Sequence, residues 1–137
     1  KKFIETYKIE DGIIESCVHN GIPFVLAGSI RDDGPLPEVI GNVYDAQNAM
    51  REQIRKATTV ICLATQLHTI AACNMTPSYR VVDGNVRPLF IYTVDVSEFA
   101  INKLQDRGSL SATGIITNAQ DFVVMVAKGI QKKIEQR

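Results

Sequence analysis

Apolar residues along the chain follow two alternating spacings, which predict strands and helices in turn. Four uninterrupted apolar runs are typical of parallel strands buried on both sides: 22–27, 59–64, 89–94 and 112–116. Helical spacing predicts helices over 11–19, 43–57, 66–73, 98–106 and from Asn118 onward. This alternation indicates an α/β fold, an open parallel sheet with helices on both faces.

Polar and small residues mark the ends of several of these elements. Ser97 and Asn118 are placed to cap the helices that follow them, and Asn20-Gly21 supplies a stop for the first helix. The stretch 78–88 is predicted to be a hairpin or excursion around Asp83-Gly84. In the last helix we expect the apolar side chains to point inward: Phe122, Val123, Val126, Ile130 and Ile134.

The composition is that of one soluble globular domain, residues 1–137. The chain has 15 Lys and Arg residues and 15 Asp and Glu residues, so its formal net charge is zero. A neutral chain is not expected to bind nucleic acid or an anionic membrane through phosphate groups. No apolar run reaches the ~18 residues of a membrane-spanning helix, and the start does not resemble a signal peptide. The cysteines Cys17, Cys62 and Cys73 form no CxxC motif, which favours reduced thiols and a cytoplasmic protein.

The loop after the first apolar run is the most informative place for chemistry, because parallel sheets bind ligands beyond the carboxyl ends of their strands. Gly28 lets the backbone approach an anion closely. The amides of Ser29 and Ile30, with the Ser29 hydroxyl, are suited to a pyrophosphate. The loop lacks the GxGxxG fingerprint, so an ordinary strand-to-helix turn is the competing interpretation.

Other strand ends carry residues with two interpretations each. Asp95 is either a ribose ligand or a turn residue, while Thr65 and Asn118 are helix caps that also suit a ligand. His68 either contacts a nicotinamide or substrate, or is a hydrogen-bonded helix residue. The consecutive charges Arg31, Asp32 and Asp33 form a solvated loop, or they bind a substrate carboxylate and amine.

A zinc site built from Cys62, His68 and Cys73 is not expected, since their spacing matches no common site.

Several segments together resemble one known family. Residues 27–37, Ala-Gly-Ser-Ile-Arg-Asp-Asp-Gly-Pro-Leu-Pro, resemble the signature loop of the LOR/SDH-type family, the archaeal-type NAD-dependent ornithine cyclodeaminases. Further segments agree in order and approximate spacing: 63–71 with Asn74-Met75, 94–97 and 114–117. The resemblance covers most of residues 11–128.

The resemblance implies a deoxyhypusine-synthase-like, Rossmann-like NAD-binding fold. It also implies conversion of ornithine to proline and ammonia by transient hydride transfer to bound NAD, with the protein supplying positioning and electrostatics. Carried over by position, the cofactor-binding residues are Gly28, Ser29, Ile30, Gly34, Thr65, Leu67, His68, Asp95 and Asn118. The resemblance implies that Arg31, Asp32 and Asp33 approach the nicotinamide end and an ornithine-like amino-acid substrate as the catalytic residues.

The chain departs from the family pattern at several places. Asn118 stands where the family usually has Asp, Cys73 stands where it has Gly, and Asp83-Gly84 and Arg87-Pro88 look like inserted turn residues. The resemblance also implies a preceding half of the nucleotide domain, which we expect these 137 residues not to contain.

Three functions follow as alternatives. They are the carboxyl-terminal part of an ornithine cyclodeaminase-type lyase, a non-catalytic NAD-binding or regulatory module, and a nucleotide domain of a lysine-degradation enzyme. We expect a homo-oligomer, or a partner chain that supplies the missing half, because an open sheet edge favours association.

Overall fold

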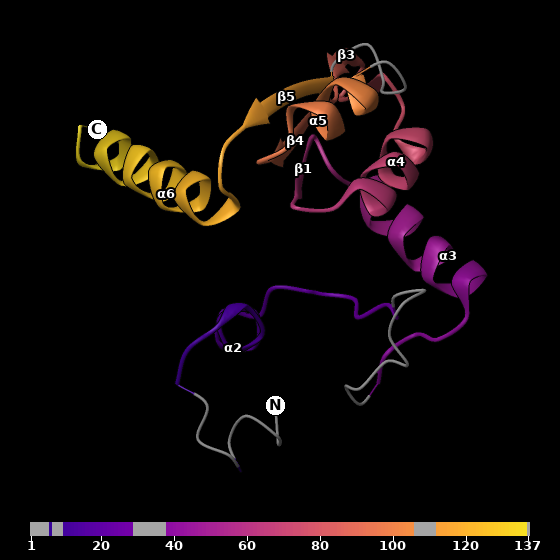
Figure 1. Cartoon of the computed structure of the whole chain (residues 1–137), viewed down its shortest axis with the longest axis horizontal. Helices are drawn as coiled ribbons and strands as arrows, with labels where there is room; N and C mark the ends of the chain where they lie inside the picture. The colour runs from indigo at the N-terminus through magenta and orange to yellow at the C-terminus, as the bar shows by residue number, and fades with distance from the viewer. Residues whose placement is uncertain (1–5, 7–9, 29–37, 106–111, 137) are drawn as a thin grey trace. The chain divides into compact units, whose positions relative to one another are not determined.

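The computed structural model describes residues 6, 10–28, 38–105 and 112–136. The chain divides into two compact units, Lys1–Ala49 and Met50–Arg137 (Figure 1). The second unit contains the β-sheet and most of the helices.

In the first unit, helix α2 (Ile13–His19) forms as predicted and ends at the expected stop. Gly21 has a φ of 64°. The amide of Gly21 donates to the carbonyl of Val18 (3.4 Å) and that of Ile22 to the carbonyl of Cys17 (2.8 Å), which is a Schellman ending.

The predicted strand over 22–27 is wrong for the described structure, in which only Ala27 makes an isolated parallel bridge, to Ile40. An apolar run becomes a strand only when a neighbour pairs with its backbone along its length. No such neighbour is present among the described residues.

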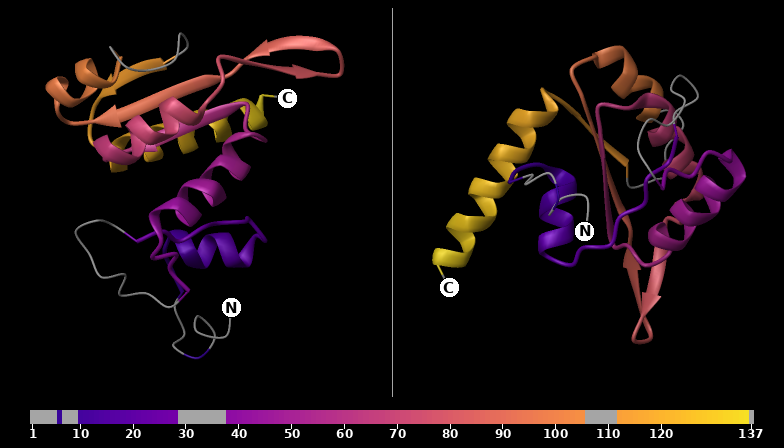
Figure 2. Two further views of the ribbon diagram at one scale, coloured as in Figure 1. Left: turned by 90° about the vertical axis from the view of Figure 1, so that its right-hand side faces the viewer. Right: turned by 90° about the horizontal axis from the view of Figure 1, so that it is seen from below.

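The second unit is built on a parallel sheet. Strands β1 (Thr59–Leu63), β4 (Phe90–Asp95) and β5 (Ala112–Ile116) pair in the order β1-β4-β5, so the described sheet has three strands where the apolar runs predicted four. Helix α4 (Gln66–Met75) and helix α5 (Glu98–Gln105) lie on one side of the strands, and helix α6 (Ala119–Glu135) lies on the other (Figure 2). The predicted α/β architecture with helices on both faces is confirmed.

The sheet register sorts side chains into two faces. Cys62 is level with Thr93, and Val60 with Ile91; these four residues form what we call the covered face. Cys62 packs there with Ala72 of α4 and with Ile54, the last residue of helix α3 (Val43–Ile54). On the opposite side, Ile61, Leu63 and Phe90 are 47%, 37% and 45% exposed, and we call this side the open face.

The predicted hairpin is confirmed. Strands β2 (Tyr79–Val82) and β3 (Asn85–Pro88) pair antiparallel, and Asp83 and Gly84 between them have φ values of 52° and 76°. Positive φ at both turn residues is what a two-residue type I′ loop requires. Arg87 and Pro88, expected as turn residues, instead lie in β3, because a proline is tolerated at the end of a strand in a two-stranded ribbon.

Helix α6 begins at the predicted cap, but its apolar side chains do not point into a core. None of its residues is buried, so the expectation that Phe122, Val123, Val126, Ile130 and Ile134 face inward is wrong for the described structure. Among the described elements, α6 packs mainly against β4, which cannot cover a stripe of this length. Within the described ranges, no helix combines the length and apolar character needed to cross a membrane.

Candidate functional site

Three strand-to-helix turns meet at the carboxyl edge of the sheet, beyond the end of β4. The amide of Ala64, after β1, donates to the carbonyl of Val94 at 2.9 Å. The amide of Thr117, after β5, donates to the carbonyl of Asp95 at 3.0 Å. The end of β4 therefore holds the turn on either side of it, and we call the group Thr65, His68, Asp95, Thr117 and Asn118 the carboxyl-edge site.

The turn between β1 and α4 leaves the first amides of α4 without a side-chain cap. Ala64 adopts a left-handed φ of 51°, and Thr65 at the N-cap position is extended. The Thr65 hydroxyl makes no capping bond and instead lies 3.1 Å from Nδ1 of His68. Uncapped amides at a helix N-terminus are donors for an anionic or carbonyl group.

A buried threonine lies directly beneath this turn. Thr69 is fully buried, and its hydroxyl donates to the carbonyl of Thr65. Burial raises the pKa of the Cys62 thiol, and a hydrogen bond with the Thr69 side chain offsets part of that rise. Burial also raises the pKa of Cys73, with a further contribution from nearby Cys62. Both groups are therefore neutral thiols near pH 7, and Cys62 can share a hydrogen bond with Thr69.

Of the two interpretations open for Asp95, the structure shows the turn role, and the ribose role stays a prediction. Oδ1 accepts from the amide of Ser97 at 2.9 Å, which is the turn role. Within the described ranges no partner is found for Oδ2, so this oxygen is available to hydroxyl groups of a ligand. Ser97 itself caps α5 as predicted, accepting from the amide of Ala100 at 3.3 Å.

The capping role of Asn118 is confirmed. Its Oδ1 accepts from the amide of Gln120 at 2.8 Å, and the residue is exposed. Thr65, by contrast, occupies the N-cap position of α4 without capping it. Of the three residues predicted as caps, Ser97 and Asn118 cap their helices and Thr65 does not, so the N-terminus of α4 is the one left open.

The structure brings five of the predicted cofactor-binding residues to one edge: Thr65, Leu67, His68, Asp95 and Asn118. Leu67 and His68 are both exposed on the first turn of α4. The sixth described residue, Gly28, belongs to the first unit, where its amide donates to the carbonyl of Ile40 at 3.0 Å. A Cβ at Gly28 would meet only ordinary contacts, at 3.6 Å, so the described neighbours do not require glycine there.

The remaining predicted residues lie outside the described residues: Ser29, Ile30, Arg31, Asp32, Asp33 and Gly34.

Sequence reasoning missed Thr69 and the left-handed Ala64. The available signal for Thr69 was a threonine four residues after the cap, on the apolar side of a helix. Nothing in the composition of the turn indicated Ala64, since glycine or asparagine is the usual residue at positive φ.

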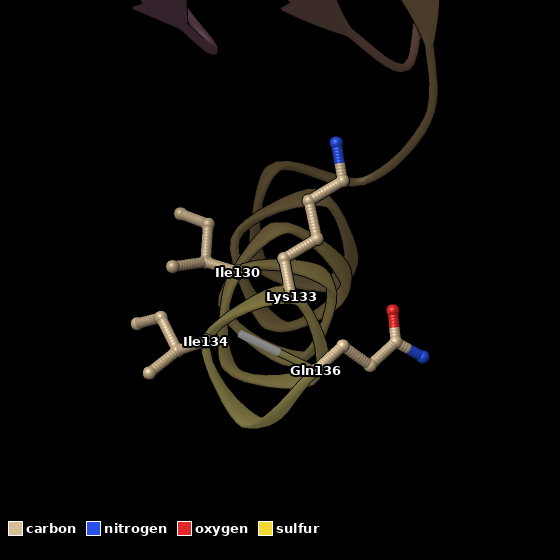
Figure 3. Close-up of a pocket in the computed structure, with 4 residues that line it drawn as sticks. All are labelled: Ile130, Lys133, Ile134 and Gln136. Atoms are coloured by element: carbon tan, nitrogen blue, oxygen red, sulfur yellow. The ribbon is translucent and has the colours of Figure 1, made fainter.

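No group of three or more His, Cys, Asp or Glu side chains suited to a metal is found in the part of the chain that the structure describes. A pocket lined by Ile130, Lys133, Ile134 and Gln136 lies near the end of α6 (Figure 3). All its lining residues come from the last turns of a single helix, so it does not belong to the carboxyl-edge site.

Residues 1–126 match the family described as "Arginine dihydrolase ArgZ-like, C-terminal, Rossmann fold". The chain is 45% identical over 137 residues to an ornithine cyclodeaminase of Archaeoglobus fulgidus, covering all of this chain and 31% of that enzyme. It is 36% identical over 132 residues to the bifunctional arginine dihydrolase/ornithine cyclodeaminase ArgZ of Synechocystis, covering 96% of this chain and 17% of that enzyme. The chain thus spans a third or less of the length of these relatives.

Solved structures agree with the fold. A LOR/SDH protein of Methanococcus maripaludis superposes with a TM-score of 0.80 at 37% identity, covering 94% of this chain and 36% of that one. The ternary complex of AgrE with ornithine and NAD+ superposes with a TM-score of 0.77 at 36% identity, covering 94% of this chain and 18% of that one. The family resemblance and the Rossmann-type fold expected from the sequence are confirmed.

Proposed function

Because the chain belongs to the family of ArgZ-like C-terminal Rossmann folds, we propose that it forms the NAD-binding part of an ornithine cyclodeaminase-type lyase. The reaction converts ornithine to proline with loss of ammonia. When bound, NAD supplies a hydride acceptor that is restored within the turnover, so it is not consumed. The residues of this chain bind and orient the reactants.

The observation that carries the proposal is that amide donors of α4 and a carboxylate acceptor of Asp95 both lie at the carboxyl edge. The first amides of α4 have no side-chain cap, and Oδ2 of Asp95 has no partner in the described ranges. A dinucleotide offers the complementary groups, namely phosphate and carbonyl oxygens that accept and ribose hydroxyls that donate. Thr65 and His68 add polar side chains at the same edge.

The substrate side of the proposal depends on the loop residues Arg31, Asp32 and Asp33, which lie outside the described residues. A guanidinium suits the substrate carboxylate, and carboxylates suit an amino group. Support for this assignment comes from the family pattern and from the AgrE complex with ornithine and NAD+. The same pattern supports Gly28, Ser29, Ile30 and Gly34 as neighbours of the cofactor.

Cofactor binding is tested on the native protein. It is denatured, the released ligand is identified by absorbance and mass, and NAD is titrated into protein stripped of ligand. We expect NAD to be recovered and to rebind. Recovery of no nucleotide together with no binding on titration would contradict the proposal.

The Asp95→Asn variant tests the ribose role without disturbing the turn. The asparagine oxygen still accepts from the Ser97 amide, but its NH₂ group cannot accept from a hydroxyl. We expect NAD affinity to fall by about tenfold or more, the loss of one charge-assisted hydrogen bond. The matched control is Asp121→Asn in the exposed first turn of α6, which should bind NAD as the wild type does.

Catalysis is tested with Asp33→Asn. We expect this variant to retain NAD and to form no proline from ornithine, because the carboxylate that holds the substrate amine is lost. Unchanged proline formation would refute the substrate role of Asp33.

We further propose that residues 1–137 work as a single nucleotide-binding domain within a larger assembly. Either other segments of a longer chain, a partner chain or further copies complete the active site. The small share of each relative that this chain covers supports this view. Light scattering on the native protein tests it, and a stable monomer of this chain alone with full activity would contradict it.

We also propose a cytoplasmic location, supported by three cysteines that are all unpaired.

A further inference from the structure

Hydrogen bonds from β4 and from α4 hold the turn that carries Thr65 and His68. Its backbone passes through a left-handed alanine, Ala64, whose amide is tied to Val94 of β4. The hydroxyl of the next residue, Thr65, lies against His68 and makes no hydrogen bond with the first amides of α4. On the α4 side, a side-chain anchor is the hydroxyl of Thr69, which donates to the Thr65 carbonyl.

The position of Thr69 makes this bond hard to replace. The residue is fully buried, so no water is at hand to take over if the hydroxyl moves away. Its side chain also lies next to the thiol of Cys62 in β1, whose pKa it lowers against the larger effect of burial. One buried hydroxyl therefore ties the turn to the first turn of the helix.

We propose that Thr69 is a positioning residue for cofactor binding: by fixing the Thr65 carbonyl from below, its buried hydroxyl aims the Thr65–His68 pair and the open amides of α4 at the ligand. This inference rests on the proposed NAD-binding function. Thr69 touches no ligand itself and acts through Thr65.

The same helix offers a matched control at its other end. Thr76, the C-cap residue of α4, is also buried, and its hydroxyl donates to the carbonyl four residues earlier, that of Ala72, at 2.5 Å. Substituting valine at either position removes a buried hydroxyl of the same type from the same helix. Only Thr69 lies under the carboxyl-edge site.

The experiment compares Thr69→Val, Thr69→Ser and Thr76→Val in the native protein, stripped of ligand. NAD affinity is measured by titration, and thermal stability is measured without NAD. We expect Thr69→Val to weaken NAD binding by about tenfold, which corresponds to one lost positioning hydrogen bond, and Thr69→Ser to restore most of it. Thr76→Val should lower the melting temperature similarly and leave NAD affinity within about twofold of the wild type.

A second pair of variants tests whether Thr69 acts through Thr65. In a Thr65→Val background, Thr69→Val should cost less NAD affinity than it does in the wild type, because the Thr65–His68 pair is already broken and only the open α4 amides remain to be misplaced. Wild-type affinity in Thr69→Val, or an equal loss in Thr76→Val, would overturn the inference while leaving the proposed function intact. Failure of the wild-type protein to bind NAD would overturn both.

Discussion

The two faces of the sheet carry similarly apolar side chains but meet different surroundings. On the covered face, Cys62 is buried beside α4 and the end of α3, and Ile91 is fully buried. On the open face, Ile61 and Phe90 remain nearly half exposed, although α6 lies on that side and Val94 is buried. An apolar run therefore indicates that both sides of a strand are to be buried. It does not indicate which part of the protein packs against each side.

The strongest test of this comparison substitutes one isoleucine on each face. Ile91→Ala should lower the free energy of unfolding by roughly 2–5 kcal/mol, because it leaves a cavity in a closed core. Ile61→Ala, in the neighbouring strand, should cost about 1 kcal/mol or less, because its side chain is largely hydrated already. Urea denaturation of both variants measures the difference.

Equal losses would break the comparison. They would mean that the open face is covered in the native protein by residues outside the described ranges.

A smaller effect separates the helices on the two sides. Ser97→Ala and Asn118→Ala each remove a side-chain cap, worth about 1 kcal/mol to the helix concerned. Because Ala100 and Ile101 of α5 are buried and nothing in α6 is, Ser97→Ala should lower global stability more. Asn118→Ala should mainly speed amide exchange in the first turn of α6. The reverse order would show that α6 is the better packed helix.

The smallest effect concerns the thiol of the covered face. Burial raises the pKa of Cys62 in the folded protein, so the unfolded chain loses this proton at a lower pH than the folded one. The raised pKa of the Cys62 thiol contributes to the free energy of unfolding. This contribution is fully present below the unfolded pKa of about 8.5 and is lost as the pH rises above that value. Unfolding measured between about pH 8 and 9.5 should show a steeper decline for the wild type than for Cys62→Ala. Parallel curves would contradict the burial of this thiol.

The sequence predicted those parts of the fold that depend on local patterns. The apolar runs located β1, β4 and β5, and Asp83-Gly84 located the hairpin, because a turn with two positive φ values favours few residue pairs. Ser97 and Asn118 were found because short polar side chains cap helices. The predicted strand at 22–27 failed because pairing depends on a neighbour, which the run itself does not specify.

The candidate site shows the same limit. The rule that ligands bind at carboxyl ends of parallel strands located Thr65, His68 and Asp95. It did not reveal that Asp95 uses one oxygen for its own turn, or that Thr69 supports Thr65 from below. Both features depend on the side-chain conformation within the packed structure. Many sequences with the same apolar pattern would place these side chains differently.

The hairpin also bears on how this unit reaches its fold. It lies between β1 and β4, and it brings Ser78 and Leu89 together, where a backbone hydrogen bond of 3.2 Å closes its base. A hairpin that forms early, in about 1–10 μs, shortens the effective loop that must close before the two parallel strands pair. Gly84→Ala, which strains the turn at a φ of 76°, should therefore slow refolding more than it speeds unfolding. An unchanged refolding rate would show that β1 and β4 find each other before the hairpin forms.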